Sequence, residues 1–254
     1  MNMPEYNDEI KDLEEKISKT KYNKSTQHAI GLMKAKLAKL KEKEDSRGSG
    51  TKKNEGYDVR KSGDGTVILI GFPSVGKSTL LNDLTNAESK TAAYAFTTLT
   101  VVPGTMIYND AKIQILDVPG IVKGAASGIG RGKEVLSVMR SADLALIIVD
   151  VNQPDHYSAL LKEIYDANIR INKDKPDVKI VKTMTGGLKI ASTVKLTKID
   201  FETVKIVMKE FKIINADVVI RSNIDVDELI DVIEGNKKYI PALTIINKID
   251  LATE

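Results

Sequence analysis

The chain has 254 residues, of which 42% are hydrophobic and 29% are charged. A chain of this length removes roughly 70–75% of its unfolded surface from water on folding, so we expect one or two domains with apolar cores. The absence of cysteine excludes disulfides and thiolate metal sites and fits a cytoplasmic protein. The N-terminus lacks the apolar segment of a secretory signal, and the longest apolar run, 142–149, is far too short to span a membrane. These features predict a soluble, cytoplasmic protein.

The charge is unevenly distributed. The segment 16–53 holds twelve Lys or Arg and three acids, a local balance of +9 in a chain whose net charge is +3, so the remainder sums to −6. A basic end joined to a mildly acidic body favours contact with a polyanion such as RNA. The alternative is a solvated, lysine-rich helical face.

Two helices are predicted within residues 5–44. Apolar side chains recur three and four positions apart in each, at Ile10, Leu13 and Ile17 and then at Ile30, Met33, Leu37 and Leu40. The apolar stripe of such a hairpin needs a partner, either the next domain or another molecule. A linker rich in Gly, Ser and charge follows at 48–65.

The segment 66–167 alternates between strand-like and helix-like stretches. Strands are expected at 66–72, 99–108, 112–117 and 144–151, with helices at 77–86, at a stretch ending near 140 and at 155–167. This alternation predicts an α/β fold: a mostly parallel sheet with helices on both faces.

Residues 168–237 have a different texture, typical of a compact α+β insert. The stretches 178–184 and 188–196 alternate around Gly186 and Gly187, which predicts a β-hairpin. Helices at 201–211 and 225–234 flank a strand near 216–221, and a buried strand at 242–246 returns to the first sheet.

The first functional motif, residues 71–78, is GFPSVGKS and matches G-x4-G-K-[ST] between a strand and a helix. Backbone N–H groups of such a loop surround phosphates at a helix N-terminus. Lys77 is expected to reach the β- and γ-phosphates, and the Ser78 hydroxyl to bind Mg²⁺.

Two further motifs follow apolar strands. Asp117 begins D-V-P-G, in which the carboxylate can hold Mg²⁺ through water and the Gly120 amide can contact the γ-phosphate. Asn247 begins N-K-I-D, in which the Asp250 carboxylate can accept two hydrogen bonds from guanine, a pair of donors that adenine lacks. The predicted GTP-binding residues are Phe72, Pro73, Ser74, Val75, Gly76, Lys77, Ser78, Thr79, Asp117, Gly120, Asn247, Lys248 and Asp250.

A threonine between the helix at 77–86 and the strand at 99–108 can close over Mg²⁺ only when a γ-phosphate is present. Thr98 is our candidate, and Thr97 is the alternative. We predict catalytic roles for Lys77, Thr98 and Gly120, and metal binding by Ser78, Thr98 and, through water, Asp117.

At this point the chain resembles a known family, the developmentally regulated GTP-binding proteins within the Obg-related GTPases. The resemblance rests on GFPSVGKSTLL, YAFTTLTVVPG, IQILDVPGIVKGAASGIGRGKEV and NKKYIPALTIINKID. It implies an N-terminal helical domain, a P-loop G domain interrupted by an insert similar to domain 2 of ribosomal protein S5, and a C-terminal TGS domain. The domain boundaries that we predict are 1–47 for the hairpin, 48–65 for the linker, 66–167 and 238–254 for the G domain, and 168–237 for the insert.

Departures from a standard GTPase at two residues and at the C-terminus affect the predictions. Ile121 stands where Ras-like GTPases place the glutamine that orients the attacking water, so we expect slow intrinsic hydrolysis, on the order of 10⁻⁴ to 10⁻² s⁻¹. Ser74 stands where many relatives have an asparagine that helps to hold a monovalent cation, which leaves K⁺ as a candidate second ion. The chain also stops four residues after Asp250, so we expect a truncated G domain with weakened nucleotide affinity and an exposed apolar strip on its sheet.

These predictions combine into a GTP-hydrolysing switch that uses Mg²⁺ and acts on translation, the ribosome or RNA through the basic N-terminal segment. A regulatory protein is a further candidate partner, and neither a membrane nor DNA is expected. The alternative is a GTP-gated module that binds RNA or protein with negligible hydrolysis. An ATPase is disfavoured by Asp250.

Overall fold

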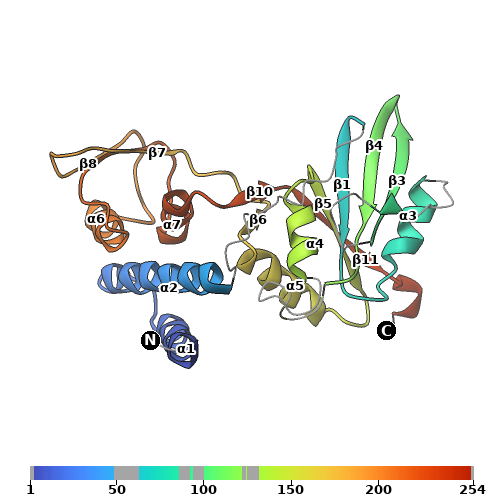
Figure 1. Cartoon of the computed structure of the whole chain (residues 1–254), viewed down its shortest axis with the longest axis horizontal. Coiled ribbons are helices and arrows are strands. Elements are labelled where there is room, and N and C mark those ends of the chain that lie inside the picture. The colour runs from blue at the N-terminus through green and yellow to red at the C-terminus, as the bar shows by residue number, and fades with distance from the viewer. Residues whose placement is uncertain are drawn as a thin grey trace. The chain divides into compact units, whose positions relative to one another are not determined.

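The computed structural model describes residues 3–48, 63–85, 92–93, 100–121, 124 and 132–252 (Figure 1). The chain forms two compact units. The hairpin unit comprises residues 1–53 and 175–237, and the sheet unit comprises 54–174 and 238–254. None of the described helices is both long enough and apolar enough to cross a bilayer.

The sheet unit is built on six strands in the order β11-β5-β1-β4-β3-β2. Their bounds are β1 (Gly65–Ile70), β2 (Ala92–Ala93), β3 (Thr100–Tyr108), β4 (Ala111–Asp117), β5 (Leu144–Asp150) and β11 (Ala242–Asn247). β11, β5, β1 and β4 are parallel, whereas β3 pairs antiparallel with β4 and β2 antiparallel with β3. This confirms the mostly parallel α/β sheet predicted from the alternating pattern.

The residues of β1 and of the turn between β3 and β4 explain why these parts of the sheet form. The central strand β1 carries a continuous apolar run, and Ile68, Leu69 and Ile70 are fully buried. Each such side chain contributes about 1.5–3 kcal/mol through its burial. Asn109 and Asp110 connect β3 to β4 with φ angles of 47° and 65°, the left-handed pair that a two-residue hairpin turn requires.

The remaining elements of the sheet unit are helices and a second, smaller sheet. The helices are α3 (Lys77–Thr85), α4 (Gly132–Met139), α5 (Asp155–Asp166) and the short 3₁₀ turn η1 (Ile249–Leu251). Two three-residue strands, β6 (Ile169–Ile171) and β10 (Lys238–Ile240), pair in parallel. The sequence did not predict either of them, because three residues are too few to show a strand period.

The edge strand β11 leaves apolar side chains in solvent. Leu243 is 59% exposed and Ile246 is 61% exposed, and β5 is the strand that pairs with β11.

The hairpin unit joins the two N-terminal helices to the inserted segment. Its helices are α1 (Met3–Lys19), α2 (Gln27–Gly48), α6 (Phe201–Glu210) and α7 (Val226–Glu234), and its strands are β7 (Val178–Lys182), β8 (Leu188–Ser192) and β9 (Ala216–Ile220). In Figure 1, α2 runs alongside α6 and α7, and it contacts both of them as well as α1. The residues of α2 that pack against the insert are Gly31, Ala35 and Ala38. They lie on a different face of the helix from the predicted apolar stripe of Ile30, Met33, Leu37 and Leu40.

The helices α2 and α6 approach each other closely at a glycine. A Cβ added to Gly31 would lie 2.9 Å from Cγ2 of Thr203 and 3.6 Å from Cγ2 of Val207. A glycine inside a helix costs about 1 kcal/mol relative to alanine. Here its missing side chain lets the two helices pack closely.

The predicted hairpin between β7 and β8 is wrong in its pairing. The chain does turn at Gly186 and Gly187, whose φ angles are 102° and 72°, but β9 lies between the two strands. β9 pairs antiparallel with β7 and parallel with β8. The Asn215 side chain, just before β9, bonds both sides of the turn: its Oδ1 accepts from the Gly187 amide at 2.9 Å, and its Nδ2 donates to the Met184 carbonyl at 3.1 Å.

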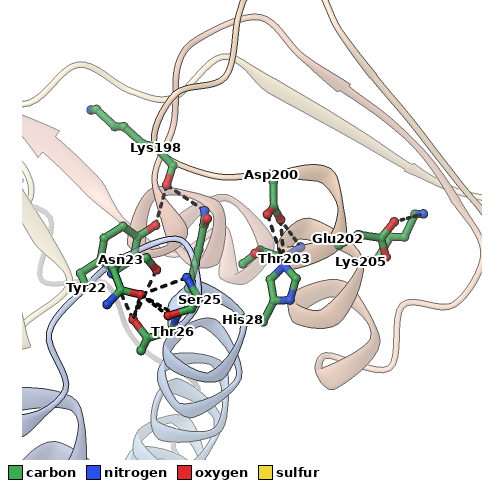
Figure 2. Close-up of polar contacts among 11 residues, drawn as sticks. Tyr22, Asn23, Ser25, Thr26, His28, Lys198, Asp200, Glu202, Thr203 and Lys205 are labelled. Atoms are coloured by element: carbon green, nitrogen blue, oxygen red, sulfur yellow. Dashed lines mark hydrogen bonds and ion pairs between the residues drawn. The ribbon is translucent and has the colours of Figure 1, made fainter.

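A polar cluster joins the start of α2 to the start of α6 (Figure 2). The Tyr22 hydroxyl donates to the Lys198 carbonyl oxygen at 2.6 Å. Nε2 of His28 lies 3.2 Å from each carboxylate oxygen of Asp200. Asp200 is also the N-cap of α6, because its Oδ1 accepts from the Thr203 amide at 2.7 Å. One carboxylate therefore both caps a helix and binds the hairpin.

Three lysines of α2, in the segment predicted to meet RNA, are engaged within this unit. Nζ of Lys34 lies 2.6 Å from Oδ2 of Asp227, and Nζ of Lys39 lies 2.9 Å from Oε1 of Glu210. Lys41 pairs with Glu14 of α1 at 2.8 Å. Part of the basic charge is thus neutralised by the protein's own acids.

Candidate functional site

The loop between β1 and α3 has the backbone of a phosphate-binding turn. Ser74 and Gly76 adopt left-handed conformations, with φ angles of 64° and 96°. A Cβ on Gly76 would lie 2.3 Å from Nδ2 of Asn247, so glycine is required there. The loop leads into the N-terminus of α3, whose unpaired backbone amides favour an anion.

Lys77, the first residue of α3, folds back over this loop. Its Nζ donates to the carbonyl oxygens of Phe72 at 2.9 Å and Gly71 at 3.3 Å, and the residue is 7% exposed. Burial lowers the pKa of the Lys77 ammonium, and the Asp117 carboxylate opposes that shift. The arrangement holds a cation inside the loop, where phosphate oxygens can bind it.

Asp117 ends β4 beside the start of α3. The Ser78 hydroxyl donates to Oδ2 of Asp117 at 2.5 Å. Oδ1 of the same carboxylate is buried, with no hydrogen-bond partner among the described residues. A hydroxyl and a carboxylate with an unused oxygen form an all-oxygen donor set, which is the type that Mg²⁺ prefers. The residues present therefore fit a magnesium ion.

The backbone after Asp117 lies directly on the phosphate-type loop. A Cβ on Gly120 would lie 2.5 Å from the Pro73 nitrogen, and the Ile121 amide donates to the Gly71 carbonyl at 3.0 Å. The Ile121 side chain is 1% exposed and packs in the apolar core. It therefore points away from any position where it could orient a water molecule.

The third motif meets the same loop from the far edge of the sheet. Nδ2 of Asn247 donates to the Val75 carbonyl at 2.8 Å. Nζ of Lys248 lies 2.7 Å from Oδ2 of Asp150, at the end of β5. Asp250 is exposed in η1, where its carboxylate is accessible to a ligand.

The structure thus brings together the residues predicted from three distant motifs. Lys77 and Ser78 meet Asp117, and Val75 meets Asn247. Pro73, Ser74, Ser78 and Thr79 are exposed along the loop and the first turn of α3. Thr98 and its alternative Thr97 lie outside the described residues, as do residues 122–123 and 125–131.

Two contacts at the site were not predicted. The Phe72 ring stacks on His156 of α5 with a centroid distance of 4.2 Å and an interplanar angle of 25°. Asp150 holds Lys248, and the signal that could have revealed it is an acid at the end of an otherwise apolar strand, as at Asp117.

Comparisons with known proteins agree with this geometry. Residues 66–184 match the family described as 50S ribosome-binding GTPase, and residues 185–254 match the C-terminal region of the MMR_HSR1 domain. The chain is 56% identical over 247 residues to an uncharacterized GTP-binding protein of Methanocaldococcus jannaschii, covering 97% of this chain and 63% of that protein. It is 47% identical over 248 residues to developmentally-regulated G-protein 3 of Arabidopsis thaliana, covering 96% of this chain and 67% of that protein.

Among solved structures, the G domain of the T. maritima FeoB iron transporter matches with 26% identity. The match covers 42% of this chain and 69% of that chain, with a TM-score of 0.35. The chain spans about two thirds of the length of its sequence relatives, with values of 63% and 67%. High identity maintained over that length establishes that the chain belongs to the family of developmentally regulated GTP-binding proteins.

Proposed function

We propose that this chain binds GTP with Mg²⁺ and hydrolyses it slowly, as a molecular switch. The observation that carries the proposal is the convergence of Lys77, Asp117 and Asn247 on one loop. Three segments far apart in the sequence place a cation, a carboxylate and an amide around a single turn. A nucleoside triphosphate needs this combination of groups.

The phosphate end of the ligand would be held by the loop and the start of α3. Lys77 would exchange its bonds to loop carbonyls for bonds to the β- and γ-phosphates. The Gly120 amide, whose residue lies against Pro73 of the loop, would contact the γ-phosphate. Ser78 and Asp117 would hold Mg²⁺, the latter through water, and the ion when bound supplies charge neutralisation between the phosphates. Thr98 is proposed to complete this site.

The base end would be recognised by Asp250. Its carboxylate can accept from the N1–H and the 2-amino group of guanine, whereas adenine would leave it unpaired. Asn247 acts differently, because its amide holds the guanine motif against the phosphate loop at Val75. The motif proposed to bind the base and the loop proposed to bind the phosphates are therefore joined by a direct hydrogen bond.

Hydrolysis by the isolated chain should be slow. The buried Ile121 offers no polar group to the attacking water, so another residue, an ion or a partner must assist. K⁺ is a candidate ion, supported by the exposed Ser74 in the phosphate loop. The second candidate function, GTP-gated binding with negligible hydrolysis, is favoured by the same burial of Ile121.

A role at the ribosome or on RNA in the cytoplasm is proposed from the family description and from the basic segment. The ion pairs of Lys34, Lys39 and Lys41 reduce the charge that α2 can offer to a polyanion. A regulatory protein that completes or activates the site is a further proposed partner.

The test is competition of GTP, GDP and ATP against a fluorescent guanine nucleotide, together with single-turnover phosphate release with and without K⁺ and ribosomes. We expect GTP and GDP to bind far more tightly than ATP. An Asp250→Asn variant should weaken GTP and favour xanthosine triphosphate, because an amide donates to the 2-carbonyl of xanthine. Equal affinity for ATP and GTP would refute the guanine assignment, and phosphate release indistinguishable from that of the nucleotide alone would favour the binding module.

A further inference from the structure

The guanine motif contains a residue in an uncommon backbone conformation. Lys248 has φ 59° and ψ 39°, in the left-handed region that L-residues with a side chain rarely adopt. This residue redirects the chain from β11 into η1, and Asp250 lies two positions further on. The orientation of Asp250 therefore depends on keeping Lys248 in this conformation.

Contacts on both sides of this turn hold it. Before the turn, Nδ2 of Asn247 donates to the Val75 carbonyl at 2.8 Å, and the Asn247 carbonyl accepts from the Val151 amide at 3.1 Å. At the turn itself, Nζ of Lys248 donates to Oδ2 of Asp150 at 2.7 Å. After it, the Leu251 amide donates to the Lys248 carbonyl at 3.0 Å. Among these contacts, the bond to Asp150 is the one that holds the Lys248 side chain.

Asp150 is itself well fixed. It is the last residue of β5, lies in register with Asn247 across the parallel pair, and is 8% exposed. Its Oδ1 accepts from the Asn152 amide at 2.9 Å, so the two carboxylate oxygens have separate partners. The hydrogen bond from Lys248, followed by the one from the Asn152 amide, lowers the pKa of Asp150 and keeps it ionised at neutral pH.

We propose that Asp150 is a positioning residue for guanine recognition, which acts by holding Lys248 so that Asp250 faces the base. The inference rests on the proposed guanine site and adds a residue to it from another strand. The Asp150 carboxylate accepts hydrogen bonds from the Asn152 amide and from Lys248, and neither of these bonds involves the phosphate loop. Its loss should therefore weaken recognition of the base and leave recognition of the phosphates unchanged.

The test separates these two parts of the ligand. Asp150→Asn keeps the size of the side chain and an acceptor for the Asn152 amide but removes the charge that holds Lys248. GDP and GTP affinity is expected to fall about tenfold, the effect of losing one hydrogen bond between charged groups. Inorganic tripolyphosphate, which offers only phosphate oxygens, should compete equally well against the wild type and the variant. The matched control is Asp155→Asn, an exposed acid at the start of α5, which should leave both affinities unchanged.

Two further variants keep the inference testable if Asp150→Asn folds poorly. Lys248→Met should reproduce the loss for GDP, and adding Asp150→Asn to it should cause no further loss, because the two residues act as a pair. Asp150→Glu, which restores the charge, should recover part of the affinity. An equal loss for tripolyphosphate, or additive losses in the double variant, would overturn the inference. Wild-type protein that does not prefer GTP over ATP would instead refute the proposed guanine site itself.

Discussion

The two units of this protein place lysines in contrasting settings. In the sheet unit, Lys77 begins α3 after the loop that follows β1, and Lys248 directly follows β11. Lys77 donates to carbonyl oxygens of the preceding loop, and Lys248 pairs with Asp150. In the hairpin unit, Lys34 and Lys39 extend from α2 and pair with acids of α7 and α6. A short motif fixes the position of its lysine relative to a strand and a helix, and so its chemistry can be inferred. A run of positive charge does not identify its partners. Here two of the lysines pair with acids of the same protein.

Two glycines, one in each unit, show a similar contrast. Gly120 in the sheet unit and Gly31 in the hairpin unit both lie where a Cβ would collide with a neighbour. At Gly120 the neighbour is the backbone of the phosphate-type loop, and the missing side chain lets the chain after β4 lie against that loop. At Gly31 the neighbour is the methyl group of Thr203, and the space serves helix packing. The same residue type therefore brings a loop against the proposed site in one unit and packs two helices in the other.

The largest expected effect tests the functional side of this contrast. Lys77→Ala should lower GTP affinity at least about a hundredfold, because two hydrogen bonds from a charged group contribute about 1.5–3 kcal/mol each. Its thermal unfolding midpoint should not fall, since the substitution removes a buried charge. Fluorescence titration and thermal unfolding check both statements.

Lys162→Ala, at an exposed position of α5, is the matched control and should change neither quantity. If Lys77→Ala bound GTP within threefold of the wild type, the loop would not be a phosphate site.

Features encoded within a few residues were predicted correctly. The apolar run at 66–72 predicted the strand β1, and the stretches at 99–108 and 112–117 predicted β3 and β4. These strands are recognisable because their strand-forming side chains follow one another in the sequence. The three motifs were likewise recognisable because each follows a strand end.

Features that depend on distant residues were not predicted. Lys34 and Asp227 are 193 positions apart, and no local pattern reveals their ion pair. The turn at Gly186 and Gly187 favoured a hairpin, but Asn215 and β9 complete it instead. Asp150 stands out in the sequence as an acid at the end of an apolar strand, but its partner Lys248 is identified only when β11 lies beside β5.

The next largest effect concerns the polar cluster of Figure 2. It tests whether contacts between the N-terminal helices and the insert contribute to the free energy of unfolding. Asp200→Ala should destabilise the hairpin unit by about 1–2 kcal/mol, because it removes an N-cap and the contact to His28. Asp200→Asn retains the cap acceptor and should lose less. Chemical denaturation of both variants measures the difference.

The pH dependence of this effect has a defined sign. Burial raises the pKa of Asp200, but hydrogen bonds from Thr203 and His28 outweigh it and the net pKa is lowered. A lowered pKa gives stability that is present above the unfolded value of about 3.9 and is lost as the pH falls through the folded value. The gap between wild type and Asp200→Asn should therefore close below about pH 4. A gap that widened with acidification would contradict the assigned contacts.

Gly31→Ala probes the close packing of α2 on α6. An alanine in an exposed helix would gain about 1 kcal/mol, whereas overpacking costs roughly 1–3 kcal/mol. We expect a net loss of about 1 kcal/mol in the free energy of unfolding. Adding Thr203→Ser removes the methyl group that the new Cβ would meet and should restore part of the loss. A stabilised Gly31→Ala protein would show that the helices can separate at little cost.

The smallest expected effect tests whether lysines of α2 contact a polyanion such as RNA. Lys34→Gln breaks a partly exposed ion pair with Asp227 and should lower stability by less than about 1 kcal/mol. Lys36→Gln changes an exposed neighbouring lysine and should leave stability unchanged.

Binding of a generic RNA, measured across a range of salt concentrations, separates the two lysines. If α2 meets RNA, Lys36→Gln should reduce the slope of log affinity against log salt by roughly 0.7–0.9, the release of about one counterion. Lys34→Gln should reduce it less, because Asp227 already neutralises that charge in the fold. Equal slopes in the wild type and Lys36→Gln would exclude this position from contact with RNA, and the lysines of α2 would then serve the packing of the hairpin unit as the ion pairs of Lys34 and Lys39 do.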